Sequence, residues 1–273
     1  MAAIKLLTYA LCLAAGIIFP LFALAGSPGI VAGAVLSLSL WIGLGWHATR
    51  RVENRLHLLK LPFNDHQRLE GTVLELSRRI HAESPQLRLL PAKTINVIAF
   101  GWNAKDGIIA LSQGALDNLK DDELAASLGW AITSLNHPET ALNLWSSQFI
   151  HLWERILVPQ SLKKSSALTW LLRLLAFPWF TLTFLILKPS MTTEAIDARS
   201  IKLSRLPLAL AEALKAMEVS ASRNPLTAPI STERFFMHPP LNQQSVSHWL
   251  LENRRLVPRV QMIQKSFFSV VSP

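Results

Sequence analysis

Cysteine is nearly absent from this chain, which has a single Cys12 among 273 residues. An intramolecular disulfide and a cysteine-based metal site are therefore both excluded, and cysteine usage does not indicate a compartment. Charge is also scarce, because only 16% of the residues are charged while 50% are hydrophobic. This balance is too apolar for an ordinary soluble domain and too charged for a chain embedded in a membrane throughout. It predicts a protein with both kinds of part.

Acidic residues are fewer than basic ones, and the formal net charge is +9. The Lys and Arg residues are scattered or follow apolar segments, and no motif combines basic with aromatic residues. This pattern is typical of a membrane protein with cytoplasmic flanks and argues against nucleic acid as a partner. No internal repeat or low-complexity tract is visible.

Two apolar runs occupy the first part of the chain, residues 4–25 and 30–46, with a turn-forming sequence between them. At about 1.5 Å per helical residue, each run is long enough to cross a hydrocarbon core of about 30 Å. Residues 1–50 are therefore predicted to form an N-terminal transmembrane hairpin with the lipid bilayer as a partner. A secretory signal is the rival interpretation of the first run, but its immediate continuation into a second run favours a retained hairpin.

Basic residues crowd the exit of the second run, whereas the turn between the runs carries no charge. These basic residues are Arg50, Arg51, Arg55 and Lys60. The positive-inside rule then puts both ends of the hairpin in the cytoplasm. The expected location is a bacterial-type inner membrane, with a multi-pass chain whose soluble part faces the cytoplasm.

Residues 61–140 have a soluble character and mixed periodicity. Apolar residues recur at helical spacing in residues 67–82 and again in residues 122–139. Between these helices, residues 94–100 and 107–111 are short β-type runs joined by a glycine-containing connection. The order of helix, β-hairpin and helix predicts an α+β arrangement.

Residues 141–188 are apolar again and are split by a polar segment at residues 159–166. The first piece has an apolar face and a few charges, so an interfacial position is open for it. If the segments before and after this insertion pack into one domain, its two pieces must either both cross the membrane or both stay out. We expect a second membrane hairpin here, although Lys163 and Lys164 would then lie outside, against the charge rule.

Residues 189–273 are soluble once more and form the second part of the predicted domain. Residues 194–218 read as a long helix with a break at Pro207, and a final helix is expected to include Val246, Trp249 and Leu250. The predicted fold is mainly α, of α+β type, with helical membrane hairpins and a small β-hairpin or sheet in the cytoplasmic domain.

Three stretches, in order, resemble the HtpX family of bacterial membrane zinc endopeptidases, relatives of the CAAX prenyl endopeptidases. The first is residues 96–135, with an Asn-containing strand, a glycine turn, a second strand and an acidic helix start. The second is residues 193–203, and the third is residues 236–241, which contain His238 before two prolines. The resemblance implies a zincin-like metallopeptidase domain, formed by residues 61–140 and 189–273.

Members of that family hold zinc with two His residues of an HExxH helix and a Glu from a later helix, and the Glu of HExxH activates the metal-bound water. In this chain Trp130 stands for the first His, Ala131 for the catalytic Glu and Ser134 for the second His. The later Glu aligns with Thr193. All four functional groups are lost, and the chain contains no HExxH anywhere.

Neighbouring residues do not restore the predicted site. Glu194 is one residue from the ligand position, which turns it about 100° around the helix. His137 is followed by Pro138, which disfavours a helical conformation at His137. Asp197 faces the site one turn later and fits a supporting role, while His238 is expected to be a structural turn residue or to line a groove.

Two functions remain open from the sequence. The first is a membrane-anchored pseudopeptidase without a cofactor, which has lost hydrolysis and binds lipid, a membrane protein or a peptide. The alternative is an active membrane metalloendopeptidase with a non-standard site. Against the alternative, no Ser, His and Asp set stands out by its spacing.

Overall fold

A computed structural model describes residues 2–157, 178, 181–183, 185–187, 193–238 and 259–263. The chain divides into two compact units, each built from two stretches. Met1–Ala48 and Leu142–Pro189 form what is called here the hairpin unit. Thr49–Ala141 and Ser190–Pro273 form the sheet unit. The predicted final helix and the polar segment at residues 159–166 lie outside the described residues.

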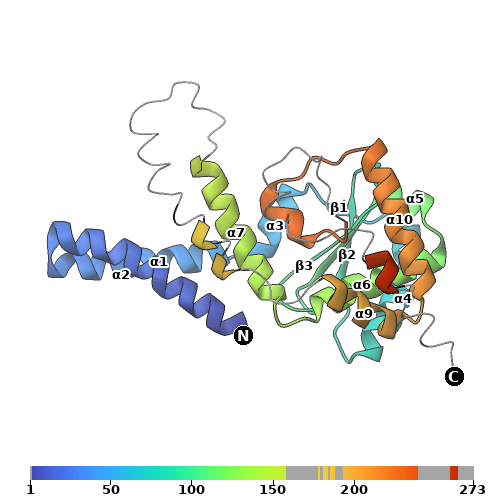
Figure 1. Cartoon of the computed structure of the whole chain (residues 1–273), viewed down its shortest axis with the longest axis horizontal. Helices are drawn as coiled ribbons and strands as arrows, with labels where there is room; N and C mark the ends of the chain where they lie inside the picture. Colours follow the sequence, from blue (N-terminus) through green and yellow to red (C-terminus); the bar gives the residue numbers. More distant parts are fainter. Residues whose placement is uncertain are drawn as a thin grey trace. The chain divides into compact units, whose positions relative to one another are not determined.

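Figure 1 shows the helices and strands along the chain. In chain order they are α1 (Ala2–Ala25), α2 (Ser27–Gly45), α3 (Ala48–Arg55), β1 (Leu59–Lys60), α4 (Phe63–Arg79), β2 (Gln86–Leu90), β3 (Val97–Phe100), β4 (Ile108–Ser112), α5 (Gln113–Asn118), α6 (Asp121–Leu135), α7 (Thr140–Leu157), α9 (Thr193–Ser204), α10 (Pro207–Arg223) and the short 3-10 helix η1 (Ile230–Phe235). The chain is mostly helical with one small sheet, which confirms the predicted fold class.

In the hairpin unit, α1 and α2 pack side by side (Figure 1). A Cβ atom at Gly33 would lie 2.9 Å from Ile18 Cγ1, so the glycine permits this close approach. Both helices are long and apolar enough to cross a membrane. The predicted four-residue turn is wrong in extent, because Gly26 alone separates the helices; Ser27 already begins α2, whose first turn accommodates Pro28.

The second apolar segment of the chain packs within the same unit. The Tyr9 hydroxyl on α1 hydrogen bonds with Thr183 Oγ1 at 2.7 Å. Trp153 on α7 donates from Nε1 to the same Thr183 oxygen at 3.0 Å. Phe149 stands edge-on to Tyr9, with ring centroids 4.7 Å apart. Polar and aromatic contacts therefore join α1 to both described parts of the apolar insertion.

The sheet of the sheet unit has four strands in the order β1-β2-β4-β3. Strands β3 and β4 form the predicted antiparallel hairpin, with Val97 opposite Leu111. The sequence interpretation missed β1 and β2, which are antiparallel to each other, and β2 runs parallel to β4. Beyond β3, an isolated antiparallel bridge links Ile98 to Phe236.

Helix α6 is central in the sheet unit, since it packs against β3 and against α4, α9 and α10 (Figure 1). The predicted long helix of residues 194–218 is two helices, α9 and α10, which are separated at Arg205 and Leu206. Arg205 has a φ of 59°, and Pro207 opens α10. A helix cannot continue through this geometry, so the break falls where Pro207 predicts it.

Candidate functional site

Helix α6 carries three of the four positions at which the resemblance implies metal chemistry. Its first turn holds three acidic residues, and Glu123 Oε2 accepts a hydrogen bond from the Lys120 backbone N–H at 3.1 Å. Both features favour a helix start. The predicted helix of residues 122–139 is wrong at its end, because α6 stops at Leu135. Pro138 restricts His137, and the Thr140 hydroxyl donates to the Ser134 carbonyl near the end of the helix at 2.6 Å.

Helix α9 crosses α6 at a contact between small residues. A Cβ atom at Gly129 would lie 3.1 Å from the Cβ atom of Ser204. Beyond the C-terminal end of α6, His137 feels the charge of Arg199, which lies nearer the N-terminal end of α9 than Ser204 does. Since residue numbers rise along α6 while they fall along α9, the two helices are antiparallel. The N-terminal end of α9, with Thr193 and Asp197, therefore faces the C-terminal half of α6.

Two of the four positions at which the resemblance implies metal chemistry are occupied by core side chains. Trp130 is 3% exposed and Ala131 is fully buried, and both belong to the main hydrophobic core. Ser134 and Thr193 are half-buried. Neither Trp130 Nε1 nor Ser134 Oγ has a hydrogen-bond partner in the part of the chain that the structure describes. Glu194 is exposed, in keeping with its expected offset around α9.

Asp197 is fully buried and forms a bidentate ion pair that the sequence did not indicate. Its Oδ2 accepts from Arg259 Nε at 2.7 Å, and its Oδ1 accepts from Arg259 Nη2 at 2.8 Å. Arg259 is also fully buried, and its Nη1 donates to the Met237 carbonyl at 2.9 Å. No signal singles out Arg259 from the other arginines of its segment, because its partner lies 62 residues away.

His238 is fixed through its backbone by the residue that precedes strand β3. Asn96 Nδ2 donates to the His238 carbonyl at 2.7 Å, and the His238 N–H donates to Asn96 Oδ1 at 3.3 Å. The preceding Met237 N–H donates to the Val97 carbonyl at 2.8 Å. Together with the Arg259 bonds, these contacts connect the three stretches that carry the resemblance. The two prolines after His238 lie outside the described residues.

His137 follows the end of α6 and accepts a hydrogen bond at Nδ1 from the Glu139 backbone N–H, over 3.2 Å. Burial lowers the pKa of His137 below its ordinary value; the Glu139 carboxylate opposes this shift and Arg199 adds to it. The imidazole is therefore favoured in its neutral form. A neutral imidazole is a metal ligand in principle, but the described residues contain no group of three or more His, Cys, Asp and Glu side chains that fits a metal ion.

The site does not fit a zinc ion. Zinc in proteins takes nitrogen, sulfur or carboxylate ligands, usually four in a tetrahedron. Asp197 is the carboxylate that the resemblance places beside the expected site, and both of its oxygens are bound by Arg259. A guanidinium is positively charged and always protonated, so it repels a metal cation. No step of a metal-assisted reaction follows from these residues.

Comparison with known proteins gives a short alignment of higher identity and longer alignments of lower identity. The chain is 33% identical to Protease HtpX of Stutzerimonas stutzeri over 104 residues, which is 37% of this chain and 33% of that relative. It is 24% identical to Protease HtpX homolog of a Nostoc species over 254 residues, 88% of each chain. The homologue from Salinibacter ruber is 23% identical over 230 residues, 81% of this chain and 83% of the relative.

The stronger identity thus spans about a third of the relative's length, and the long alignments are more distant. No family model matches the chain. No solved structure matches it either.

Proposed function

We propose that this HtpX-like chain is a membrane-anchored pseudopeptidase, which has lost hydrolysis and acts by binding a protein or lipid partner. The similarity to proteins named Protease HtpX homolog over most of the chain supports a member of a membrane peptidase family. The proposed loss of hydrolysis rests on the side chains that occupy the expected zinc site. Where the resemblance implies a zinc site, Trp130 and Ala131 belong to the core and the Asp197 carboxylate is neutralised by Arg259.

The physical reason is that the charge of the Asp197 carboxylate is balanced without a metal. A buried carboxylate needs a compensating charge, and a bidentate guanidinium supplies both charge and directed hydrogen bonds. Ala131 has no group that accepts a proton from a water molecule, so the general base of the resembled enzymes has no counterpart at this position. The zincin-like character of the domain is part of this proposal.

The proposed arrangement in the cell follows from the two units. Residues 1–50 would anchor the chain in a bacterial-type inner membrane, and residues 141–188 would add a second hairpin. The hydrogen bonds from Tyr9 and Trp153 to Thr183 support a common environment for both segments. Residues 61–140 and 189–273 would form the peptidase-like domain. This domain would lie in the cytoplasm, because the positive-inside rule places the basic residues that follow α2 on that side.

The decisive experiment measures metal and activity together. Detergent-purified protein should contain no stoichiometric zinc by elemental analysis, and its casein cleavage should equal that of a buffer control with or without chelator. Stoichiometric zinc with chelator-sensitive cleavage would establish the alternative, an active membrane metalloendopeptidase with a non-standard site.

A restoration experiment tests the positions themselves. A variant that combines Trp130→His, Ala131→Glu, Ser134→His and Thr193→Glu should bind zinc, because it regains the ligand set of the resembled family. The matched control keeps Thr193 and carries the other three changes, and it should bind zinc more weakly since one ligand is missing. If a folded four-substitution variant binds no more zinc than the unmodified chain, the alignment of these positions is wrong.

A further inference from the structure

The segment between α2 and α4, residues 46–62, is rich in basic residues. It contains four Lys and Arg residues and a single acidic residue, Glu53. That carboxylate is already engaged, because Glu53 Oε1 accepts a hydrogen bond from Arg88 Nε on β2 at 2.6 Å. The positive charge of the segment is therefore not balanced by acidic residues of its own.

Buried apolar side chains fix this segment to the sheet unit. Val52 and Leu56 lie one turn apart on α3 and are buried, and Leu61 directly after β1 is buried as well. On a different side of α3, Arg50 is exposed. The segment is thus a folded part of the unit that presents a definite set of side chains to its surroundings.

Arg88 brings α3 and β1 to the same face of the sheet. It lies opposite Lys60 in the antiparallel β1–β2 pair, and side chains paired in this way point to one face. Glu53, which binds Arg88, lies one helical turn after Arg50 on α3. Arg50 and Lys60 therefore lie on the same side of the sheet. Neither forms an ion pair with a residue that the structure describes.

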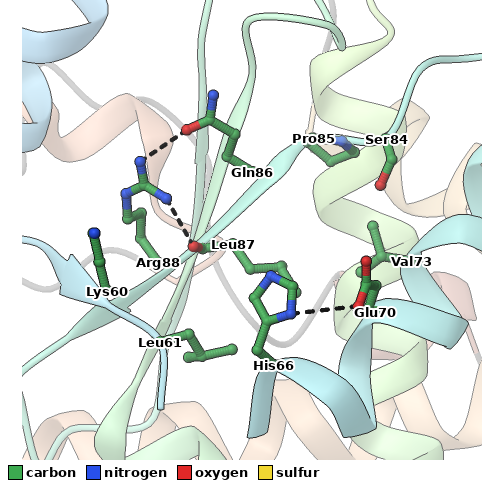
Figure 2. Close-up of a pocket in the computed structure, with 10 residues that line it drawn as sticks. All are labelled: Lys60, Leu61, His66, Glu70, Val73, Ser84, Pro85, Gln86, Leu87 and Arg88. Carbon is green, nitrogen blue, oxygen red and sulfur yellow. Dashed lines mark hydrogen bonds and ion pairs between the residues drawn. The ribbon is translucent and has the colours of Figure 1, made fainter. Parts of the chain in front are cut away.

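Lys60 lines a pocket of about 450 Å³, a volume within the range of ligand-binding pockets. Figure 2 shows Lys60 at the end of β1, with the ion pair between His66 and Glu70 of α4 elsewhere in the pocket. Lys60 takes no part in the interactions drawn there, whereas Arg88 and Glu70 both have partners. The pocket therefore gives an anionic group room beside an available ammonium.

Two large apolar side chains flank Lys60 in the sequence and are exposed. Leu59 is 53% exposed, and Phe63, the first residue of α4, is 79% exposed. Leu59 lies on β1, the strand at one end of the strand order, so its side chain stands at the edge of the sheet. Exposed apolar side chains next to cations are typical of a surface that enters the interface of a membrane.

The covalent chain keeps this surface near the membrane. Helix α2 is long and apolar enough to cross a membrane, and it ends at Gly45. Arg50 comes five residues later, so at about 3.5 Å per residue its Cα atom lies within about 18 Å of the end of α2. Lipid headgroups are therefore the anionic surface that is always within reach of these cations, whereas an acidic protein would have to be recruited.

The basic edge is the surface formed by Arg50, Leu59, Lys60 and Phe63. We propose that the basic edge binds anionic phospholipids of the membrane that holds α2. The two cations contact phosphate groups, the headgroup at Lys60 enters the pocket, and the two apolar side chains enter the interface. Basic clusters that directly follow a membrane-spanning helix attract anionic lipids in this way. The inference deepens the proposed function by naming a lipid partner, and it rests on that function only for the membrane insertion of α1 and α2.

The test places an environment-sensitive fluorophore beside Phe63 in the full chain. In a Cys12→Ser background, Asn64→Cys is labelled with nitrobenzoxadiazole, since Asn64 is exposed. The labelled chain is reconstituted in nanodiscs of phosphatidylcholine alone, or of equal parts of phosphatidylcholine and phosphatidylglycerol. Emission should be shifted to the blue only with phosphatidylglycerol, because docking of the basic edge moves the probe from water into the interface.

Charge variants of the labelled chain test the contacting residues. Arg50→Gln and Lys60→Gln should each lower the ratio of docked to undocked probe about fivefold, and the double variant should combine both losses. The matched control removes two exposed charges of the sheet unit elsewhere, by Lys202→Gln and Arg223→Gln, and should leave the ratio unchanged.

The proposal is overturned if a chain that elutes with the nanodiscs gives the same spectrum in both lipids, since the basic residues then serve topology alone. It is also overturned if the control lowers the ratio as much as the Arg50 and Lys60 changes do, because only net charge then matters. A chain that does not elute with the nanodiscs rejects the membrane anchorage and this inference together. Zinc-dependent casein cleavage by a chain whose probe docks supports this inference and rejects the loss of hydrolysis alone.

Discussion

The buried charges at the candidate site belong to Arg259 and Asp197, whereas the positions that the resemblance assigns to the metal ligands carry none. Both side chains are fully buried, and their two hydrogen bonds of 2.7 and 2.8 Å are joined by a third from Arg259 to Met237. A buried charge without its partner is costly, whereas replacing both partners by apolar groups is often neutral. The pair thus acts as one unit, and each member depends on the other.

Breaking this pair by Arg259→Met should lower the free energy of unfolding by about 3–5 kcal/mol, because it leaves the Asp197 carboxylate buried without a counter-charge. The double variant Asp197→Leu and Arg259→Met should lose clearly less than the sum of the two single changes. Urea unfolding of the full chain in detergent, followed by circular dichroism, measures all three variants. Additive losses would mean that the two side chains are not coupled.

Because His137 is favoured in its neutral form, the stability of the sheet unit depends on pH. Because the pKa of His137 in the folded chain is lowered by burial, the folded state binds this proton less readily than the unfolded state. The stabilisation is therefore present above the ordinary pKa of about 6.5 and is lost as the pH falls toward the lowered value.

The expected result is a larger loss of unfolding free energy for the unmodified chain than for His137→Gln between about pH 8 and pH 5. Protonation also blocks Nδ1 from accepting the Glu139 N–H, which adds to the effect. Urea midpoints at both pH values provide the measurement. Equal losses in the two proteins would show that His137 does not titrate differently on folding.

Helices α6 and α9 meet through small residues, and this contact sets how closely the two halves of the sheet unit approach. Ser204 stands where a side chain at Gly129 would point, and the Ser204 hydroxyl is itself tied to the Ser200 carbonyl at 2.9 Å. A larger residue at either position has to separate the helices or shift a side chain.

Gly129→Val should therefore destabilise the chain by about 1–3 kcal/mol, and Ser204→Gly should recover part of that loss. Gly71→Ala is the matched control, because a Cβ atom there meets nothing within 4 Å in the middle of α4. It should stabilise the chain by about 0.4–1 kcal/mol. A Gly129 variant as stable as the Gly71 variant would contradict the close helix contact.

Periodicity predicted α4, α6, α9 and α10 and the β3–β4 hairpin, but it did not predict α3, α5, β1 or β2. Strand β1 has only two residues, and the alternation in β2, Gln-Leu-Arg-Leu-Leu, extends over only five residues, so both signals are short. Their existence depends on pairing with distant segments. The predicted end of α6 at Glu139 is too late: the apolar face ends at Leu135, and Pro138 and the Thr140 hydroxyl favour a stop there.

In the candidate site, as in the fold, only features that lie within one short stretch of sequence can be predicted. Trp130, Ala131 and Ser134 can be predicted as substituted positions because they lie within one short motif. The partners of Asp197 and His238, which are Arg259 and Asn96, lie 62 and 142 residues away. A single sequence carries no local signal for such pairs, since each depends on the packed tertiary structure.

The molecule combines an apolar hairpin unit with a sheet unit whose core holds charged groups. Two helices of the hairpin unit, α1 and α2, are long and apolar enough to cross a membrane. Basic residues follow α2 directly, and Arg50 is exposed. The proposed orientation of the whole chain rests on this asymmetry.

Single-cysteine labelling in a Cys12→Ser background checks that orientation. Ser27→Cys, at the first residue of α2, should react with a membrane-impermeant maleimide in intact spheroplasts. Asp106→Cys, which is exposed in the sheet unit, should react after permeabilisation and not before. The opposite pattern of labelling would place the sheet unit outside the cytoplasm.

The ion pair between Asp197 and Arg259 also imposes an order of events during synthesis. A ribosome releases Asp197 62 residues before Arg259, so for that interval its carboxylate has no guanidinium to neutralise it. Burying the charged carboxylate without its guanidinium would be costly, so the docking of α9 onto α6 is disfavoured while the nascent chain still lacks Arg259. The stability of the α6–α9 contact thus depends on a residue that is synthesised after both helices.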